Sequence, residues 1–408
     1  MNRIVFICLM HLALDQNECA VFTEEQRLLR DLFQNYSKYA RPSIESDAPA
    51  IVTFRAKLKQ IVDLKDNEQL LKIILYNYMQ WENPILTWDP RDYGGVQEIN
   101  VAPEEVWVPD IVIYNSAEDV LGGLTHKYKT DVVIQANGTN IWLAPAMFLT
   151  TCQLDVRYFP FDEQKCLLKF GSWTHDSSRL DMRTQTNGSN KDIYTEHGEW
   201  QLVGVEQKRN VKYYDCCPKP YVDISYTVHI RRKSLFYSLY LILPALLITS
   251  MVLVGFHLPP ESGERMQLGI TVLLAMIVFL QFVYQNLPST SDSAPLLGKF
   301  YIVMMFLISL SLGCTCIILN YSHGYHGNEM PIWVRIIILD CLAKVFDSRP
   351  PTDKLGRFLT EADNQRRGEE WKRAARILDR FFMVAFSVMI TLAIVALVLQ
   401  APSYAFFH

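Results

Sequence analysis

The chain has 408 residues, of which 50% are hydrophobic and 20% are charged, and its formal net charge is −4. That length allows two or three domains. The charge balance gives no support for nucleic acid as a partner, and no basic face with interleaved aromatic residues points to one. We find no nucleophile elbow, metal-ligand cluster or phosphate-binding loop in the sequence, so we expect no enzymatic activity, no cofactor and no metal site.

The first residues are typical of a secretory signal peptide. Arg3 precedes an apolar stretch over residues 4–14 that is interrupted by His11. We expect residues 1–20 to be the signal and residues 21–233 to be an extracellular domain. Secretion of that domain agrees with its three N-glycosylation sequons, which also arise by chance in short stretches. The sequons lie at Asn35, Asn137 and Asn187.

Within residues 21–233 a helical pattern is followed by strand patterns. Thr23-Glu24-Glu25-Gln26 matches a capping box and precedes apolar residues at helical spacing, which predicts a short N-terminal helix. Residues alternate between apolar and polar over 224–230, and similar short runs occur at 70–79, 131–135 and 165–170. Turn residues such as Asn137-Gly138 separate these runs. The pattern predicts an extracellular all-β sandwich of about ten strands.

Four cysteines form the main set of this domain: Cys152, Cys166, Cys216 and Cys217. Four cysteines allow three pairings, and the adjacency of the last two favours the pairing with a separate Cys152–Cys166 bond. A bond between Cys216 and Cys217 would close a small strained ring and stiffen a loop tip. Alternatively, each of these two cysteines pairs elsewhere or stays reduced.

The second half of the chain holds four apolar runs without charged residues, at 235–256, 266–287, 300–319 and 381–399. Each has about the 20 residues that a helix needs to cross a bilayer. A core helix of a soluble protein can imitate one such run, but four together indicate an integral membrane protein. We expect three transmembrane helices in 234–320, a cytoplasmic segment at 321–377 with amphipathic helices, a fourth transmembrane helix at 378–400 and an extracellular C-terminus at 401–408. The many basic residues of 321–377 suit the cytoplasmic side.

The second run carries a stripe of mixed polar and apolar residues on one helical face, made of Gln267, Thr271, Leu274, Val278 and Gln281. Polar groups on that face would be costly against lipid. A water-filled axis shared by several helices accommodates them. The stripe therefore predicts a pore.

Several of these motifs in one order resemble the Cys-loop pentameric ligand-gated ion channels. Cys152 and Cys166 enclose Phe159-Pro160-Phe161-Asp162, and Gly171-Ser172-Trp173 and four spans follow. Trp107-Val108-Pro109-Asp110, Tyr114-Asn115 and the Cys216-Cys217 loop resemble nicotinic acetylcholine receptor subunits of the alpha type. The resemblance covers residues 24–399. It implies a ligand-binding sandwich joined to a transmembrane four-helix bundle in a multi-pass, pentameric channel of the plasma membrane, at synapses among other places, with both termini extracellular.

The resemblance implies an aromatic cage at subunit interfaces, in which ring faces attract a cationic agonist. The principal face would consist of Tyr114, Trp173, Tyr214, Cys216, Cys217 and Tyr221. The complementary face of the neighbouring subunit would consist of Tyr76, Val133, Ile141 and Leu143. Singly, each aromatic residue is more often a packing residue, whereas the set in registered motifs favours a cation site. Both faces on one chain permit a homopentamer, and the alternative is a hetero-pentamer with related subunits.

Two residues of the expected cage depart from the family pattern. Tyr76 stands where many subunits have tryptophan, which leaves the identity of the agonist open. His175 stands where a tyrosine is common, and a titratable ring beside a cation site predicts pH-dependent binding. The alternative for His175 is a surface residue without a role.

The resemblance also assigns roles in the pore. Leu274 and Val278 would form apolar rings that close it, and Glu264 would form an acidic ring at the cytoplasmic mouth. Anion channels of the family resemble Pro-Ala-Arg there, so Gly263-Glu264-Arg265 predicts conduction of monovalent cations, with calcium a further candidate. Gln267 replaces a smaller residue and predicts a narrower pore. Gln285 replaces an outer glutamate and predicts weaker calcium permeability.

Coupling between the domains would pass through the Cys loop, the linker after the second span and the residues before the first span. The residues implied are Asp66, Phe159, Pro160, Phe161, Asp162, Arg231 and Pro288. We expect Asp66 to be the acidic partner of Arg231. The resemblance further implies a short amphipathic helix from Met330 at the membrane surface and a helix over 360–380 that leads into the fourth span.

The sequence thus predicts a cation channel subunit that opens when an acetylcholine-like ligand binds. The closest alternatives are the same fold as a receptor for another amine, or an accessory subunit that needs partner subunits. A soluble transmitter-binding protein would lack the four spans. A membrane-anchored adhesion sandwich would need one span, and an anion channel would need a different pore mouth.

Overall fold

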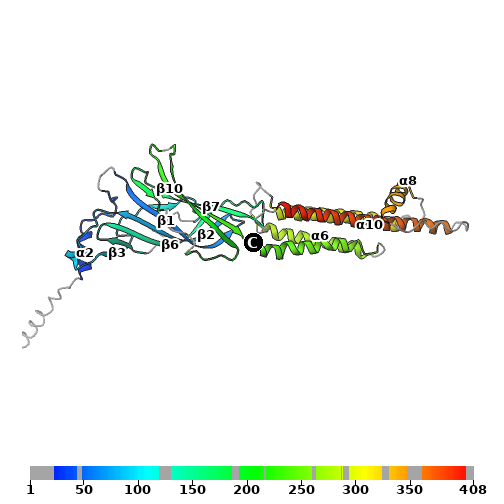
Figure 1. The fold of residues 1–408 in the computed structure, drawn as a ribbon, viewed down its shortest axis with the longest axis horizontal. Helices are drawn as coiled ribbons and strands as arrows, with labels where there is room; N and C mark the ends of the chain where they lie inside the picture. Colours follow the sequence, from blue (N-terminus) through cyan, green and yellow to red (C-terminus); the bar gives the residue numbers. More distant parts are fainter. Residues whose placement is uncertain are drawn as a thin grey trace, which may run out of the picture.

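A computed structural model describes residues 23–43, 48–118, 130–185, 193–215, 217–259, 263–285, 287, 294–323, 330–346 and 361–400. Figure 1 shows a β-sandwich and a bundle of long helices that follow each other along the longest axis of the molecule. The predicted signal peptide, Asn187, Cys216, Pro288 and residues 401–408 lie outside the described residues. Predictions about them stay predictions.

The predicted N-terminal helix is confirmed as α2 (Glu24–Phe33), which begins with a complete capping box. The Gln26 amide donates to Thr23 Oγ1 over 3.3 Å, and the Thr23 amide donates to Gln26 Oε1 over 3.1 Å. These bonds satisfy two amides that the first turn of a helix leaves without partners. Leu28 is fully buried and fixes the helix to the sandwich.

The sandwich contains the ten strands that the sequence predicts. A six-stranded sheet has the order β3-β5-β6-β2-β1-β8, and a four-stranded sheet has the order β4-β7-β10-β9. The predicted runs at 70–79, 165–170 and 224–230 fall within β2, β7 and β10, and the run at 131–135 begins one residue before β5. The bounds are β1 (Ala50–Lys65), β2 (Leu70–Glu82), β3 (Glu98–Val101), β4 (Ile111–Ile113), β5 (Val132–Gln135), β6 (Thr139–Thr151), β7 (Glu163–Ser172), β8 (Leu180–Arg183), β9 (Trp200–Lys212) and β10 (Tyr221–Arg232), with a short helix η1 (Pro90–Tyr93) between β2 and β3.

Aromatic rings from both sheets form the core of the sandwich. Phe54 of β1 and Phe148 of β6 contact Phe170 of β7 with ring centroids 4.9 and 6.0 Å apart. All three are almost completely buried. Burial of one such side chain contributes roughly 1.5–3 kcal/mol. Because alternate residues of a strand face opposite sides, this packing also decides which residues the sheets present outward.

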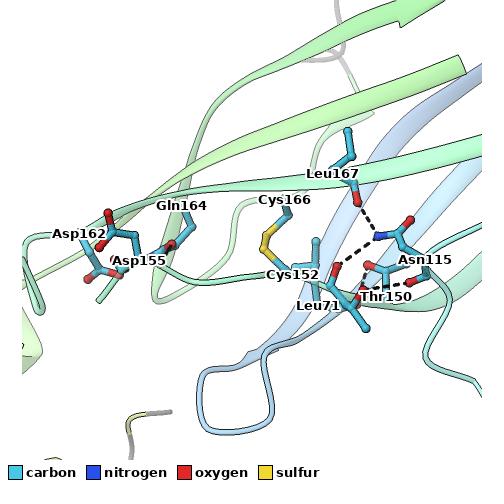
Figure 2. Close-up of a disulfide and its surroundings, with 10 residues drawn as sticks. Leu71, Asn115, Thr150, Cys152, Asp155, Asp162, Gln164, Cys166 and Leu167 are labelled. Atoms are coloured by element: carbon cyan, nitrogen blue, oxygen red, sulfur yellow. Dashed lines mark hydrogen bonds between the residues drawn. A yellow bond between two sulfur atoms is a disulfide. The ribbon is translucent and has the colours of Figure 1, made fainter. Parts of the chain in front are cut away.

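The predicted Cys152–Cys166 disulfide is confirmed, with Cα atoms 5.0 Å apart. It joins the end of β6 to β7 and closes the loop that contains Phe159 (Figure 2). Cys217 is also disulfide-bonded. Since Cys216 lies outside the described residues, the pairing of Cys216 with Cys217 stays a prediction.

Two of the predicted glycosylation sites lie in the described part of the sandwich, and both are exposed. Asn35 follows α2, and Asn137 lies in the turn between β5 and β6. The Asn137 side chain accepts a hydrogen bond from the Thr139 amide over 3.0 Å. Gly138 completes the turn with φ of +85°, a left-handed conformation that glycine adopts without strain. Glycosylation of Asn35 and Asn137 stays a prediction.

Among the residues that the structure describes, four helices are long and apolar enough to span a membrane, as the sequence predicts: Leu235–Gly255, Glu264–Gln285, Leu296–His323 and Gly368–Gln400. The first consists of α4 (Leu235–Tyr237), η3 (Ser238–Ile242) and α5 (Leu243–Gly255). The second and third are α6 (Glu264–Gln285) and α7 (Leu296–His323). The last belongs to α10 (Glu361–Gln400), a single helix of 40 residues that also includes the predicted 360–380 helix.

The expected amphipathic helix after the third span is present as α8 (Ile332–Val334), η4 (Arg335–Leu342) and α9 (Ala343–Phe346). One side is apolar and exposed: Ile332, Trp333, Ile336 and Ile337. On the opposite side, Val334 and Ile338 are buried against the rest of the protein. Such a helix suits a membrane surface.

Candidate functional site

Tyr114 and Trp173 form a ring pair at one edge of the four-stranded sheet. Tyr114 directly follows β4 and Trp173 directly follows β7, and these strands are hydrogen-bonded neighbours. Their ring centroids lie 5.9 Å apart with an interplanar angle of 78°. The Tyr114 hydroxyl donates to the Ser172 carbonyl over 2.8 Å. Burial, with the nearby Tyr214 and Asp223, raises the pKa of Tyr114, so the ring stays neutral at physiological pH.

Gly171 makes room for this pair. A Cβ atom at position 171 would lie 2.7 Å from Tyr114 Cζ and closer still to its hydroxyl oxygen. No side chain fits there without moving the tyrosine ring. The glycine of the Gly171-Ser172-Trp173 motif is therefore required by the close approach of ring and strand.

Asp110 fixes the backbone that carries Trp173. Ser172 Oγ donates to Asp110 Oδ1 over 2.6 Å, and the Thr174 amide donates to Asp110 Oδ2 over 2.8 Å. The His175 amide in turn donates to Ser172 Oγ over 2.9 Å. Hydrogen bonds to Asp110 and Ser172 thus fix the backbone on either side of Trp173, while Trp173 itself remains 67% exposed. Exposed apolar side chains indicate a binding surface when they form a contiguous patch, and Trp173 has the Tyr114 ring beside it.

Tyr214 and Tyr221 form a second ring pair, with centroids 5.8 Å apart at 73°. Tyr214 follows β9 and Tyr221 begins β10, so the hairpin of these strands brings them together. Tyr214 is 41% exposed. Both lie within electrostatic range of the Tyr114 hydroxyl. The structure therefore brings four of the predicted principal-face residues into one group, the aromatic cluster: Tyr114, Trp173, Tyr214 and Tyr221.

An ion pair that the sequence did not reveal lies against the aromatic cluster. Lys169 Nζ is 5.1 Å from the centre of the Tyr114 ring and 3.2 Å from Asp223 Oδ2. Asp223 is buried and also accepts hydrogen bonds from Asn210 and Ser225. The charge of Lys169 is balanced by Asp223, so the cluster does not present an uncompensated cation to a ligand.

The four predicted complementary-face residues lie on the other sheet. Tyr76 is on β2, Val133 on β5, and Ile141 and Leu143 on β6. Val133 faces Ile141 across the strands, and Tyr76 and Leu143 are 43% and 58% exposed. Since the two sheets of a sandwich face outward in opposite directions, these residues cannot close the aromatic cluster of their own chain. A cage built from both predicted faces would therefore require a second subunit.

All seven predicted pore residues are exposed on α6. Arg265, Val272, Met276 and Val283 are buried on the opposite side of the helix. The Thr271 hydroxyl donates to the Gln267 carbonyl over 2.8 Å, which satisfies its polar group within the helix. Leu274 and Val278 are 60% and 47% exposed. The exposed set consists of Glu264, Gln267, Thr271, Leu274, Val278, Gln281 and Gln285.

Arg232 is the buried centre of the join between sandwich and helices. Its side chain is fully buried and pairs with Asp66 over 2.6 Å, with Asp162 over 2.8 Å and with Glu199 over 2.6 Å. It also lies 4.2 Å from the Trp200 ring centre. We call Arg232 and its three carboxylates the Arg232 cluster. Burial tends to lower the pKa of Arg232, but Asp162 and Asp66 more than offset this and raise it.

The expected pair of Asp66 and Arg231 is wrong by one residue. Asp66 pairs with Arg232, whereas Arg231 Nε donates to Glu163 over 2.6 Å, and His229 contacts the same carboxylate over 2.8 Å. Successive side chains of a strand point to opposite faces, so Arg231 and Arg232 meet different partners. The strand alternation seen over 224–230 carries this information when it is extended to the end of β10.

The Cys loop contacts the helices directly. Phe159 is buried, with its ring centre 5.0 Å from that of Tyr237 in α4. The Tyr237 hydroxyl donates to Glu199 over 2.6 Å, and the Leu296 amide of α7 donates to the Arg157 carbonyl over 2.9 Å. Pro160 and Asp162 are buried and Phe161 is half-buried. The loop thus touches the beginnings of the first and third spans.

Gln164 orients Asp162 within this join. Its side-chain amide donates to Asp162 over 2.6 Å and to the Asp155 carbonyl over 2.9 Å. Figure 2 shows these three residues on one side of the disulfide. Burial raises the pKa of Asp66 to about 6, although Arg232 lowers it. No sequence pattern indicated Glu199, Trp200 or Tyr237, which come from other segments of the chain.

The described residues contain no group of three or more histidine, cysteine, aspartate or glutamate side chains that could hold a metal ion. A sandwich with an exposed aromatic cluster, joined to four apolar helices of which one presents a polar stripe, defines a ligand-gated membrane channel subunit. Residues 25–234 match the family of the neurotransmitter-gated ion-channel ligand binding domain, and residues 241–358 match the neurotransmitter-gated ion-channel transmembrane region. The chain therefore belongs to the neurotransmitter-gated ion channel (Cys-loop) family, which is not enzymatic.

Known relatives agree with this membership. The neuronal acetylcholine receptor subunit alpha-10 of Rattus norvegicus is 34% identical over 417 residues, which cover 91% of this chain and 92% of the relative. The alpha-9 subunit of Gallus gallus is 39% identical over 322 residues, or 79% of this chain and 66% of the relative. The acetylcholine receptor subunit alpha-type acr-16 of Caenorhabditis elegans is 35% identical over 333 residues, or 81% and 66%. The chain is a ligand-gated channel subunit related to nicotinic acetylcholine receptors.

Proposed function

We propose that the chain is a subunit of a plasma-membrane cation channel that opens when acetylcholine, or a ligand with the same quaternary ammonium group, binds between two subunits. The observation that carries this proposal is the aromatic cluster, in which four rings from three loops meet at one exposed edge. Acetylcholine receptor subunits among the relatives support the choice of ligand.

The chemistry of the cluster suits such a ligand. A quaternary ammonium has no hydrogen to donate, so it is attracted to ring faces, with up to about 2 kcal/mol per desolvated contact. Trp173 offers the largest exposed ring, and its backbone is already fixed by Asp110. A site fixed in this way loses little conformational entropy when it binds.

The complementary face is assigned to the neighbouring subunit. Tyr76 and Leu143 are exposed on the sheet opposite the cluster, so a ring of identical subunits would place one set against the other. Pentameric assembly is typical of the family. We infer a homopentamer, with a hetero-pentamer of related subunits as the alternative arrangement.

Cation conduction is inferred from the inner end of α6. Glu264 is exposed and Arg265 is buried, so an acidic ring would face the axis at the inner mouth. Such a ring raises the local concentration of cations. Leu274 and Val278 would close the resting pore as apolar rings, and monovalent cations are the expected permeant ions.

Opening would follow from differential binding. A ligand shifts an equilibrium only by binding one state more tightly than the other. Closure of the β9–β10 hairpin over a ligand would move β10, whose end carries Arg232. Arg232 in turn contacts Tyr237 of the first span, with its guanidinium 5.5 Å from the ring centre. This gives a continuous path from the aromatic cluster to the membrane.

A receptor for another amine is a second candidate, and Tyr76 favours it. This residue is exposed where the complementary face would close the cage, and it carries a hydroxyl that a tryptophan lacks. A primary or secondary ammonium could donate a hydrogen bond to that hydroxyl. Acetylcholine cannot.

The test is to express the chain in cells and to record currents during a panel of quaternary and primary amines. We expect acetylcholine to open the channel, and Trp173→Ala to raise its half-maximal concentration roughly ten- to thirtyfold, since one ring contact is worth up to about 2 kcal/mol. Tyr213→Ala is the matched control, because Tyr213 is a 75% exposed neighbour of Tyr214 outside the cluster. Equal effects of the two substitutions would contradict the site, and a response only to primary amines would favour the second candidate.

A further inference from the structure

We propose that Asp379 is a positioning residue for ion conduction, because it holds the Arg265 guanidinium inside the helical bundle and away from the pore. Glu264 then sets the charge of the inner mouth alone. This inference rests on the proposed cation channel and extends it to a residue of α10, outside the helix that carries the pore stripe.

The pore helix begins with two opposite charges on different faces. Glu264, the first residue of α6, is exposed on the same side as the predicted pore residues. Arg265, the next residue, is on the buried side, and 2% of its side chain is exposed. Consecutive residues of a helix differ by about 100° in direction, so a fixed contact can keep the two apart.

The contact that fixes Arg265 comes from α10. Arg265 Nη2 donates to Asp379 Oδ1, and 12% of the Asp379 side chain is exposed. The guanidinium carbon also lies 5.0 Å from the centre of the Phe256 ring, which stacks on Phe386 at 5.6 Å and 17°. Arg265 is therefore enclosed by the end of the first span and by the inner half of the last one.

Loss of the carboxylate would leave a buried cation without its counter-charge, with the Leu258 carbonyl, 3.5 Å from Nη1, as the remaining hydrogen-bond acceptor that the structure shows. A buried arginine that loses its counter-charge is strongly disfavoured. Arginine has a long, flexible side chain that reaches toward water when it can. We expect the freed side chain to turn toward the pore mouth beside Glu264, where five guanidinium groups of a pentamer would offset five carboxylates and repel cations.

The test uses single-channel recording of the full chain, opened by acetylcholine, with sodium as the main cation. Asp379→Asn is expected to lower the sodium conductance about threefold or more, since added charges near the axis act through few ångströms of water. The double variant Asp379→Asn with Arg265→Gln removes both charges and is expected to restore the wild-type conductance. Asp379→Glu keeps the charge and is expected to match the wild type.

Two results would overturn the proposal. One is wild-type conductance in Asp379→Asn. The other is a lowered conductance that the double variant fails to restore, because Asp379 would then act without Arg265. A merely structural role of Asp379 would change the amount of surface protein and leave the conductance of each channel unchanged.

A variant that fails to assemble alone is tested in mixed channels. The wild type is co-expressed with tagged Asp379→Asn, and the tag shows that the variant reaches the surface. A ladder of lowered conductance levels supports the proposal, and a single wild-type level overturns it. If the wild-type channel instead conducts chloride, the proposed function fails. The inference about Arg265 then requires Asp379→Asn to raise the chloride conductance, because the added positive charges attract anions.

Discussion

One buried arginine lies just before the first span and another lies at the beginning of the second span. Carboxylates neutralise these two arginines in different ways. Arg232, just before the first span, is paired with Asp66, Asp162 and Glu199 from three separate segments of the sandwich. Arg265, at the beginning of the second span, pairs with Asp379 as its one carboxylate among the residues that the structure describes. The first arrangement spreads the counter-charge over several segments. The second depends on a single side chain.

This difference has a functional consequence. Movement of one segment of the sandwich leaves Arg232 with other carboxylates, so the join is able to rearrange without exposing an uncompensated charge. Arg265 has no second carboxylate partner among the described residues. Its pair with Asp379 is therefore suited to holding the guanidinium in one position. Buried charges that lose their partner cost far more than the pair itself contributes. We therefore expect the join to tolerate single neutral substitutions of its acids better than the Arg265–Asp379 pair does.

The largest effect is expected from Arg232→Gln. It leaves Asp66 and Asp162 buried beside each other without a cation, at a cost of about 3–5 kcal/mol. The measurement is the thermal unfolding of the purified, detergent-solubilised protein. Arg231→Gln is the matched control, since Arg231 is the adjacent arginine with 24% of its side chain exposed. An equal fall in the unfolding temperature of both variants would show that the buried ion pairs of Arg232 are not what stabilises the join.

The next effect separates the two clusters. Asp379→Asn is expected to lower the unfolding temperature more than Asp66→Asn, because Arg232 keeps Asp162 and Glu199 while Arg265 keeps no other carboxylate from the described residues. We expect a loss of about 3 kcal/mol for Asp379→Asn and no loss for Asp66→Asn, because burial already disfavours the ionised form of Asp66 in the folded state. Both are isosteric, so the comparison isolates charge. A larger cost at Asp66 would break the contrast.

The smallest effect is a dependence on pH. The pKa of Asp66 is raised by burial to about 6, above its ordinary value of 3.8. Between pH 3.8 and about 6, the folded state therefore binds a proton at Asp66 that the unfolded state does not bind. The contribution of Asp66 to stability increases as the pH falls through about 6, and it is lost as the pH rises again. We expect the half-maximal agonist concentration to shift between pH 7.5 and 5.5 in the wild type.

Asp66→Asn provides the control for this shift. At pH 7.5 it is expected to resemble the wild type at pH 5.5, because both have a neutral side chain at position 66. The Asp66 part of the shift should also disappear in this variant. A shift of full size in Asp66→Asn would assign the pH dependence to another group, and His175 near Trp173 is then tested by His175→Gln.

Local patterns predicted most of the fold. The capping box at Thr23 and the alternation over 224–230 depend on neighbours in sequence, and both elements are found where expected. The apolar runs predicted the four spans for the same reason, since a helix in lipid must be apolar along its length. The disulfide followed from the adjacency of Cys216 and Cys217, which left Cys152 for Cys166.

The contacts between distant segments were harder to predict. Arg265 and Asp379 are 114 residues apart, and neither position differs from an ordinary charged end of a span. The error at Arg231 arose because two adjacent arginines look equivalent in sequence, while the strand directs them to opposite faces. Lys169 and Asp223 meet because β7 and β10 are neighbours, and that pairing is visible only in the fold.

The most direct test of the account is the reversal potential of the acetylcholine-evoked current when the external ions are replaced. We predict that replacing external sodium with a large impermeant cation shifts the reversal potential to negative values, whereas replacing chloride with a large impermeant anion leaves it unchanged. In Glu264→Ala the sodium current is predicted to fall. A reversal potential that follows chloride, or no current with any quaternary ammonium ligand, would contradict the account.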